Sequence, residues 1–283
     1  MRCWLTPFGV AVAALASLVS AQGAMAVPGG GAATSHRDRG GGGGYFAVAC
    51  GFSHRNMDDP IVFPRQPGRS HNHTYFGARS TDAFSTPASL REDGTTCRLR
   101  ADTAAYWAPT LFVGGRAVEP LALVAFYVRQ TSDAVDPFPA GLEVIAGDAN
   151  ARTAQSSRVT FWSCAVPRAE RSSTIPTCPG TRAGGLRLHV NFPNCWNGRS
   201  LDSANHKSHM AYSSNGACPS SHPVEVPALS LVIYYGVAGG PNSELSSGGQ
   251  FSAHADFVNA WHQPTLTRLV DRYLNRFGFG KRR

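Results

Sequence analysis

Residues 229–235 have the sequence LSLVIYY, which is rich in β-branched and aromatic side chains. Such side chains fit the pleated surface of a sheet, so residues 228–235 are predicted to form a buried β-strand. Five more short apolar runs lie between segments rich in Gly, Pro, Asn and Ser, at residues 45–50, 121–129, 141–146, 159–164 and 186–192. Short runs separated by turn residues predict an all-β domain, and we expect an antiparallel β-sandwich or jelly roll.

Helical periodicity is scarce. One helix is predicted at residues 264–277, where apolar side chains recur at helical spacing and two glycines follow. Its apolar stripe consists of Leu266, Leu269, Val270, Leu274 and Phe277. A second, shorter helix is expected near residues 256–260. We therefore expect a sandwich with long, disulfide-stabilised loops and a short C-terminal helix.

The first 26 residues have the three parts of a secretory signal peptide. Arg2 supplies a positive charge, residues 5–19 are mostly apolar, and Ala24-Met25-Ala26 matches a small-residue cleavage site. A membrane anchor is the alternative, but the apolar run is short for a spanning helix. We expect a secreted, extracellular protein whose mature chain has no membrane span.

Residues 27–44 consist mainly of Gly, Ala, Ser and Arg and end in consecutive glycines. This composition cannot bury a core, so it predicts a disordered linker. The 257 residues that follow the signal (283 minus 26) suit one all-β unit, and no internal repeat divides them. We therefore expect residues 45–283 to form a single β-sandwich domain, and the protein to be a monomer.

Six of the seven cysteines lie after the signal peptide. An even number in an exported chain predicts three disulfides, with fifteen pairings open. Short separations favour two local pairs and leave a third: Cys164–Cys178, Cys195–Cys218 and Cys50–Cys97. A zinc site built on paired cysteines is disfavoured because the chain has no C-x-x-C motif.

The formal net charge is +8, and it falls to +7 when Arg2 is removed with the signal. A basic surface can attract acidic polysaccharide or an anionic cell envelope. The alternative is that the arginines are scattered over a solvated surface, which explains the same net charge without a binding partner. No nucleic-acid-binding motif accompanies the charge, and we expect no nucleic-acid partner.

His71 and His73 lie in the motif GRSHNHTYFG at residues 68–77. Side chains alternate across a strand, so histidines two residues apart share a face. Both imidazoles could then reach one metal ion or one substrate, and imidazole also serves as an acid–base group. The structural alternative is that each ring bonds loop backbone.

Later segments add more His and Asp residues. Asp202, His206 and His209 are about one turn apart if their segment is helical or turn-like, which suits a metal ion or a His–Asp acid–base pair. His254 and Asp256 share a face if their segment is extended. A capping Asp beside solvated histidines is the alternative for the first group.

His222 precedes Pro223, so its backbone is expected to be extended and well fixed. Alone it favours a structural role, but it could join the others in one cleft. We predict that this cleft is lined by His71, His73, Asp202, His206, His209, His222, His254 and Asp256. The candidate metal ligands among them are His71, His73, His206 and His209. A divalent metal is the one cofactor that the sequence suggests, and its identity stays open.

Six further residues are candidates for substrate contact: Arg55, Asp59, Tyr106, Trp107, Trp196 and Tyr212. The aromatic rings could stack on sugars. The two tryptophans fit a core equally well, and Asp59 before Pro60 fits an ordinary turn. The sequence contains no Ser nucleophile elbow, P-loop or dinucleotide fingerprint.

Several segments between residues 45 and 262 resemble a known family when they are taken together and in order. They are DPIV (59–62), GRSHNH (68–73), GTTC (94–97), AYWAPTL (105–111), FPNCWNG (192–198), LDS (201–203), HMAY (209–212), HPV (222–224) and HADF (254–257). The chain resembles the family catalogued as domain of unknown function number nineteen ninety-six. That family occurs in secreted proteins of filamentous fungi and actinobacteria, sometimes beside WSC carbohydrate-binding modules. Asn197 and Asn205 stand where we expect acids in its pattern.

The resemblance implies a role at a cell wall or on a polysaccharide. With the His and Asp residues it leads us to expect a secreted carbohydrate-active enzyme that cleaves a polysaccharide as a glycoside hydrolase or lyase. Two alternatives stay open. One is a non-catalytic cell-wall or glycan-binding module, and the other is a His-rich metal-binding secreted protein.

Overall fold

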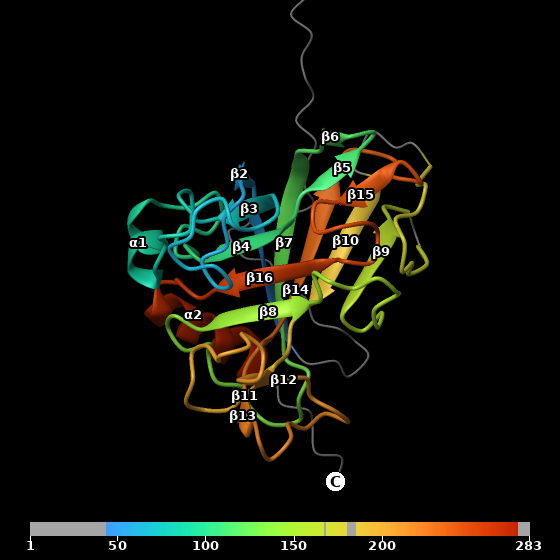
Figure 1. The fold of residues 1–283 in the computed structure, drawn as a ribbon. Coiled ribbons are helices and arrows are strands. Elements are labelled where there is room, and N and C mark those ends of the chain that lie inside the picture. The colour runs from blue at the N-terminus through green and yellow to red at the C-terminus, as the bar shows by residue number, and fades with distance from the viewer. Residues whose placement is uncertain (1–43, 167, 180–184, 277–283) are drawn as a thin grey trace, which may run out of the picture.

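The computed structural model describes residues 44–166, 168–179 and 185–276. The predicted signal peptide, nearly all of the predicted linker and Phe277, the last residue of the predicted helix, lie outside these ranges. Within them the chain is mostly β, with four antiparallel sheets (Figure 1). The predicted fold class is confirmed.

The first sheet has five strands, in the spatial order β1-β7-β14-β10-β9. They are β1 (Tyr45–Cys50), β7 (Pro120–Val128), β14 (Ala228–Tyr235), β10 (Leu186–Asn191) and β9 (Thr160–Cys164). Each coincides within about one residue with a strand predicted from composition. The LSLVIYY stretch lies in β14, the central strand, which pairs with β7 and β10.

The second sheet also has five strands, in the order β2-β3-β4-β16-β8. They are β2 (Phe52–Asn56), β3 (His73–Gly77), β4 (Ala105–Pro109), β16 (His254–Val258) and β8 (Glu143–Gly147). The helix predicted near residues 256–260 is wrong, because this segment belongs mostly to β16. Its side chains alternate instead: Ala255 and Phe257 enter the core, and Asp256 between them does not.

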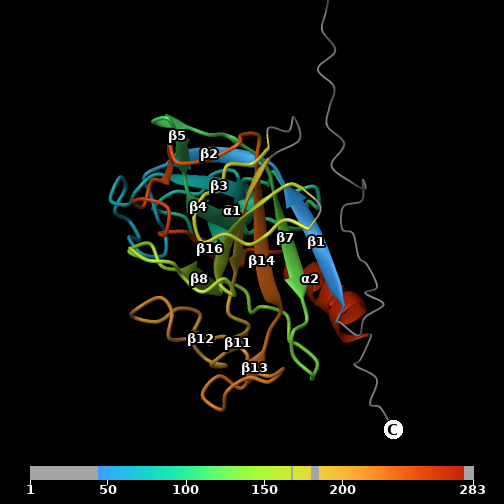
Figure 2. The ribbon, with the colours of Figure 1, turned by 90° about the vertical axis from the view of Figure 1, so that its right-hand side faces the viewer.

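The two large sheets form two layers that enclose one hydrophobic core (Figure 2). Strands β4, β16 and β8 cross in front of β7, β14 and β10 in Figure 1. Phe192, next to the first sheet, contacts Phe257 of the second with ring centroids 6.5 Å apart. Each sheet therefore has an inner face against the core and an outer face turned away from it.

A polar network lies inside this core. The hydroxyl groups of Tyr106 and Tyr127 are 2.6 Å apart, and Trp261 Nε1 donates a hydrogen bond to Tyr127. Tyr106 also bonds the carboxyl group of Asp102, whose pKa burial raises to about 8. These buried polar groups are satisfied by one another, as a stable core requires.

Smaller elements surround the sandwich. Two three-stranded sheets have the orders β12-β11-β13 and β15-β5-β6. Their strands are β11 (Cys195–Trp196), β12 (Met210–Ala211), β13 (Val224–Glu225), β5 (Leu111–Val113), β6 (Arg116–Ala117) and β15 (Ser243–Leu245). Helix α1 (Pro87–Glu92) lies near β3 and β4.

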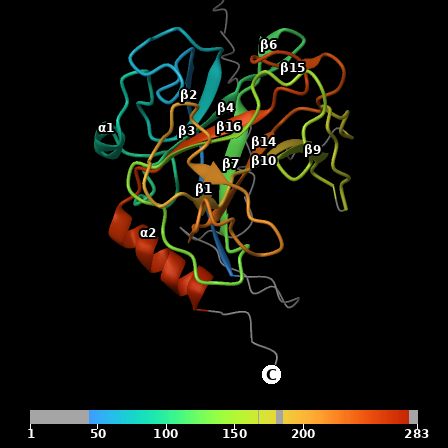
Figure 3. The same cartoon turned by 60° about the horizontal axis from the view of Figure 1, so that its bottom comes forward.

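The predicted C-terminal helix is present as α2 (Gln263–Leu269), continued by a π-helix, η1 (Val270–Asn275), beside β1 (Figure 3). Leu266, Val270 and Leu274 of the predicted stripe are buried. Among the described residues, no helix combines the length and hydropathy that a membrane crossing needs.

All three predicted disulfides form: Cys50–Cys97, Cys164–Cys178 and Cys195–Cys218. Cys195–Cys218 joins β11 to the long segment between β12 and β13, so it stabilises the three-stranded sheet β12-β11-β13. Three disulfides fit an extracellular protein, because oxidising compartments preserve them.

Candidate metal centre

The outer face of the second sheet carries the polar residues that alternate with core side chains. His73 pairs with Pro109 across β3 and β4, and Trp107 pairs with Asp256 across β4 and β16. Pro109 lies two residues beyond Trp107, and His254 lies two residues before Asp256. The register therefore places His73 and His254 on either side of Pro109.

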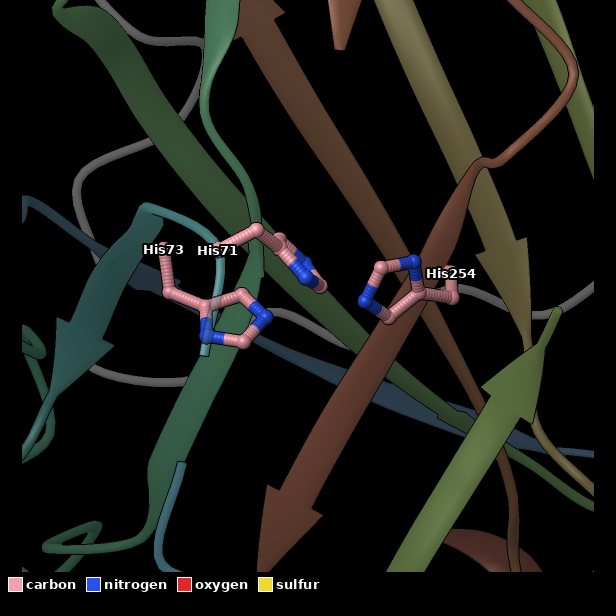
Figure 4. A group of neighbouring side chains, drawn as sticks. All are labelled: His71, His73 and His254. Atoms are coloured by element: carbon pink, nitrogen blue, oxygen red, sulfur yellow. The ribbon is translucent and has the colours of Figure 1, made fainter. Parts of the chain in front are cut away.

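Three imidazole rings converge at this place (Figure 4). Ring centroids are 4.2 Å apart for His71 and His73, 5.0 Å for His71 and His254, and 5.8 Å for His73 and His254. One nitrogen from each ring lies within 4.8 Å of one nitrogen from each other ring. His73 and His254 are buried, whereas His71 is partly exposed. The expectation that His71 and His73 reach the same point agrees with this geometry.

Backbone carbonyl groups orient two of the rings. His73 Nδ1 lies 2.9 Å from the Asp58 carbonyl oxygen, and His254 Nδ1 lies 2.8 Å from the Ser252 carbonyl oxygen. A carbonyl oxygen can only accept, so each Nδ1 donates, and in a neutral ring Nε2 then keeps its lone pair. This partnership of a histidine with a carbonyl group is common behind metal-binding imidazoles.

Two nitrogen atoms of the cluster lack partners. His71 Nε2 and His73 Nε2 are buried and have no hydrogen-bond partner among the residues that the structure describes. Buried polar atoms normally have one, so two unpartnered ring nitrogens in one cluster need an explanation. A cation bound between the rings would supply it.

Burial keeps these histidines neutral. It lowers the pKa of His71 to about 4 and that of His254 to about 3. It also lowers the pKa of His73 well below its usual value, and the neighbouring His71 and His254 add to that effect. Neutral imidazoles offer lone pairs, so all three rings are ready to bind a metal ion at neutral pH.

Two carboxyl groups border the cluster. Oxygen atoms of Asp59 and Asp256 lie within 4.8 Å of each other and of a ring nitrogen of His73. Burial raises the pKa of both groups, that of Asp256 to well above its usual value. Asp256 Oδ2 has no hydrogen-bond partner within the described ranges. A cation nearby would favour the ionised form of each carboxyl group.

The segment between β2 and β3 folds over this face and closes it. Asp58 Oδ1 accepts a bond from the Gly68 amide, and Asp59 Oδ1 accepts bonds from the Ile61 and Val62 amides at 2.9 Å. Ile61 packs with the apolar residues of the outer face. Both aspartates therefore shape the loop, as the turn interpretation of Asp59 expects, and Asp59 also reaches the histidines.

Asp202 and His206 form a separate pair. His206 Nδ1 lies 2.8 Å from Asp202 Oδ2, and both side chains are partly exposed. Burial raises the pKa of Asp59, and the charge of His206 partly opposes that shift, so the pair lies near Asp59. Lys207 Nζ donates to the Gly147 carbonyl and so fastens the loop to β8.

His209 and His222 bond neighbouring loop groups. The ring nitrogens of His209 contact Ser203 Oγ and the Glu143 carbonyl oxygen at 3.0 and 2.6 Å. Those of His222 contact Ser221 Oγ and the Ser208 carbonyl oxygen. Both histidines thus hold the loop. Of the predicted cleft residues, His71, His73 and His254 form one cluster, and Asp202 and His206 form an ion pair.

Glu143 is a candidate that the sequence reasoning missed. Burial, and then the nearby Asp202 carboxylate, raise the pKa of its side chain to about 7. It is the one charged residue of the apolar run at 141–146. That position in a predicted strand was the available signal.

The predicted aromatic contacts are dispersed. Tyr106 faces the core, and Trp107 is fully buried on the outer face. Trp196 donates from Nε1 to the Ser200 carbonyl, and Tyr212 is 44% exposed elsewhere on the surface. Arg55 lies over the Phe52 ring in β2, with 5.1 Å between guanidinium and centroid. These residues do not form one stacking platform.

Comparison with known proteins identifies the family. The profile described as domain of unknown function (DUF1996) matches residues 59–261, which include the whole histidine cluster. Neither a curated protein nor a solved structure is significantly similar to the chain. The match covers well over half of the sequence, and the chain belongs to the DUF1996 family.

Proposed function

We propose that this protein is an exported metal-binding protein that holds one divalent transition-metal ion through His71, His73 and His254. The observation that carries the proposal is the convergence of three neutral imidazoles, two of them oriented by backbone carbonyl groups. Imidazole nitrogens suit zinc and copper better than calcium or magnesium, which prefer oxygen. The partial exposure of His71 leaves one side open to a water molecule or substrate.

Export is part of the proposal. Residues 1–26 have the pattern of a secretory signal, and the three disulfides suit an oxidising compartment.

Metal analysis tests the centre directly. The mature protein, stripped with EDTA and dialysed against Zn²⁺ or Cu²⁺, should retain one ion per chain. His254→Ala should retain none, because two imidazoles do not complete the set. His222→Ala is the matched control and should bind like the unmodified protein. Equal retention by both variants would refute the centre.

A second proposal gives the centre a reaction, the cleavage of an extracellular polysaccharide. The favouring observation is that acid–base groups adjoin it: the Asp202–His206 pair and Glu143, whose pKa of about 7 suits proton transfer near neutral pH. A bound metal would polarise the substrate or activate water, and one of these groups would take the proton.

The second proposal is tested with neutral and acidic glycans. New reducing ends or unsaturated products should appear, and EDTA should abolish them. His206→Ala should lose product while it keeps its metal and its melting temperature. Tight glycan binding without products would instead favour a non-catalytic module.

A further inference from the structure

A groove of about 650 Å³ lies on the outer face of the first sheet, on the opposite side of the sandwich from the histidine cluster. Its floor includes Phe161 of β9, Asn191 of β10 and Ser230 of β14. These residues alternate with core residues such as Leu231, so they face outward. The volume is within the range of small-molecule sites.

The groove is positively charged. Arg158 and Arg171 line it, and its lining contains no acidic residue. The Arg171 guanidinium lies 4.5 Å from the Phe161 ring centroid, and the other partner of Phe161 is the His189 ring, stacked at 4.2 Å. Stacking restricts the guanidinium, so less entropy is lost when it binds an anion.

A buried donor in the lining has no acceptor. Asn194 is 1% exposed, and its Oδ1 accepts a bond from the Ser213 amide at 3.0 Å. Its Nδ2 has no partner among the described residues. A buried donor without an acceptor costs stability, so a ligand oxygen at this place would be favoured.

Two hydroxyl groups of the lining already donate their hydrogens within the protein. Tyr212 donates to the Asn191 carbonyl at 2.9 Å, and Ser230 donates to Asn191 Oδ1 at 2.7 Å. Gln130 adds another amide to the lining. The guanidinium groups of Arg158 and Arg171 therefore supply most of the donors and the positive charge of the lining, which favours a ligand with acceptor oxygens and negative charge.

We propose that this groove binds a carboxylate-bearing oligosaccharide. Arg158 and Arg171 pair with carboxylates, since a guanidinium matches a carboxylate in a bidentate geometry. Asn194 Nδ2 and Gln130 donate to hydroxyl or ring oxygens. The site is independent of the metal centre, because the two lie on opposite faces of the sandwich.

Calorimetry of the mature protein in EDTA tests this site, with trigalacturonate and the neutral trisaccharide maltotriose at one ionic strength. Trigalacturonate should bind and maltotriose should not. Arg171→Gln and Arg158→Gln should each weaken binding by about tenfold. Arg199→Gln, an exposed arginine outside the groove, is the matched control and should bind normally.

Several outcomes would overturn the assignment. They are the absence of trigalacturonate binding at millimolar concentration, equal binding of maltotriose, or equal loss in the Arg199→Gln control. Inorganic sulfate that binds as tightly as trigalacturonate would show a simple anion site and would also overturn it. Unchanged melting temperatures in the variants confirm that the measurement reports on the groove.

Discussion

The outer face of the second sheet holds imidazoles and carboxyl groups buried beneath a loop, whereas the outer face of the first sheet holds arginines open to solvent. Both faces arise in the same way, from polar residues that alternate with core residues along a strand. The difference lies in what covers them. Under a loop, burial lowers the pKa of His73 and His254; in the open groove, Arg158 and Arg171 are exposed.

The largest expected effect is that a variant on each face loses affinity only for the ligand proposed to bind that face. His73→Ala should lower metal affinity by at least about 100-fold, because it removes one of three ligands, and should leave trigalacturonate binding unchanged. Arg171→Gln should weaken trigalacturonate binding and leave metal affinity unchanged. Titration of both ligands into both variants checks this. If either variant loses both activities with an intact fold, the two faces are coupled and the comparison fails.

The next effect is a pH dependence of stability carried by His254. Its folded pKa is about 3 and its unfolded pKa about 6.5, so between these values the unfolded chain binds the extra proton. Acidification through this window therefore destabilises the folded state, by at most about 1.4 kcal/mol per pH unit for this group.

Urea unfolding of the metal-free protein and of His254→Gln, from pH 7 to pH 4, measures that contribution. As the pH falls, the unfolding free energy of the unmodified protein should decrease more than that of His254→Gln. Parallel profiles would mean that His254 titrates normally in the folded state.

A smaller effect concerns the loop that covers the histidines. Asp59→Ala removes the acceptor of the Ile61 and Val62 amides and should cost about 1–2 kcal/mol of unfolding free energy. Asp59→Asn keeps an acceptor oxygen and should cost less. Thermal melts of both variants without metal compare them, and equal losses would show that the charge matters more than the two bonds.

The smallest effect is expected on the open face. Arg171→Gln should change the unfolding free energy by less than about 0.5 kcal/mol, because exposed side chains contribute little to stability. A thermal melt beside that of Asp59→Ala measures the contrast. A loss as large as that of Asp59→Ala would show that the arginine–Phe161 stack is structural.

Composition and local pattern were sufficient to predict six strands and the three disulfides of this protein. Short apolar runs predicted β1, β7, β8, β9, β10 and β14, and cysteine spacing predicted all three disulfides. The alternation of side chains along a strand also placed His71 and His73 together. These features depend on residues near one another in the chain or on strongly apolar segments.

Strand pairing decided which side chains enter the core and which lie on the outer face. Tyr106 and Trp107 are adjacent, yet one lies in the core and the other on the outer face, and composition does not distinguish them. The 256–260 segment forms mostly a strand instead of the predicted helix because Asp256, Phe257 and Val258 pair with β4 and β8.

The meeting of His254 with His71 and His73 likewise required the register of β16 beside β4. The sequence by itself determined six of the strands and which cysteines pair, since these follow from local side-chain chemistry. Only the tertiary structure decided which imidazoles meet, because contacts between His73 and His254 depend on strands that are some 180 residues apart in the chain.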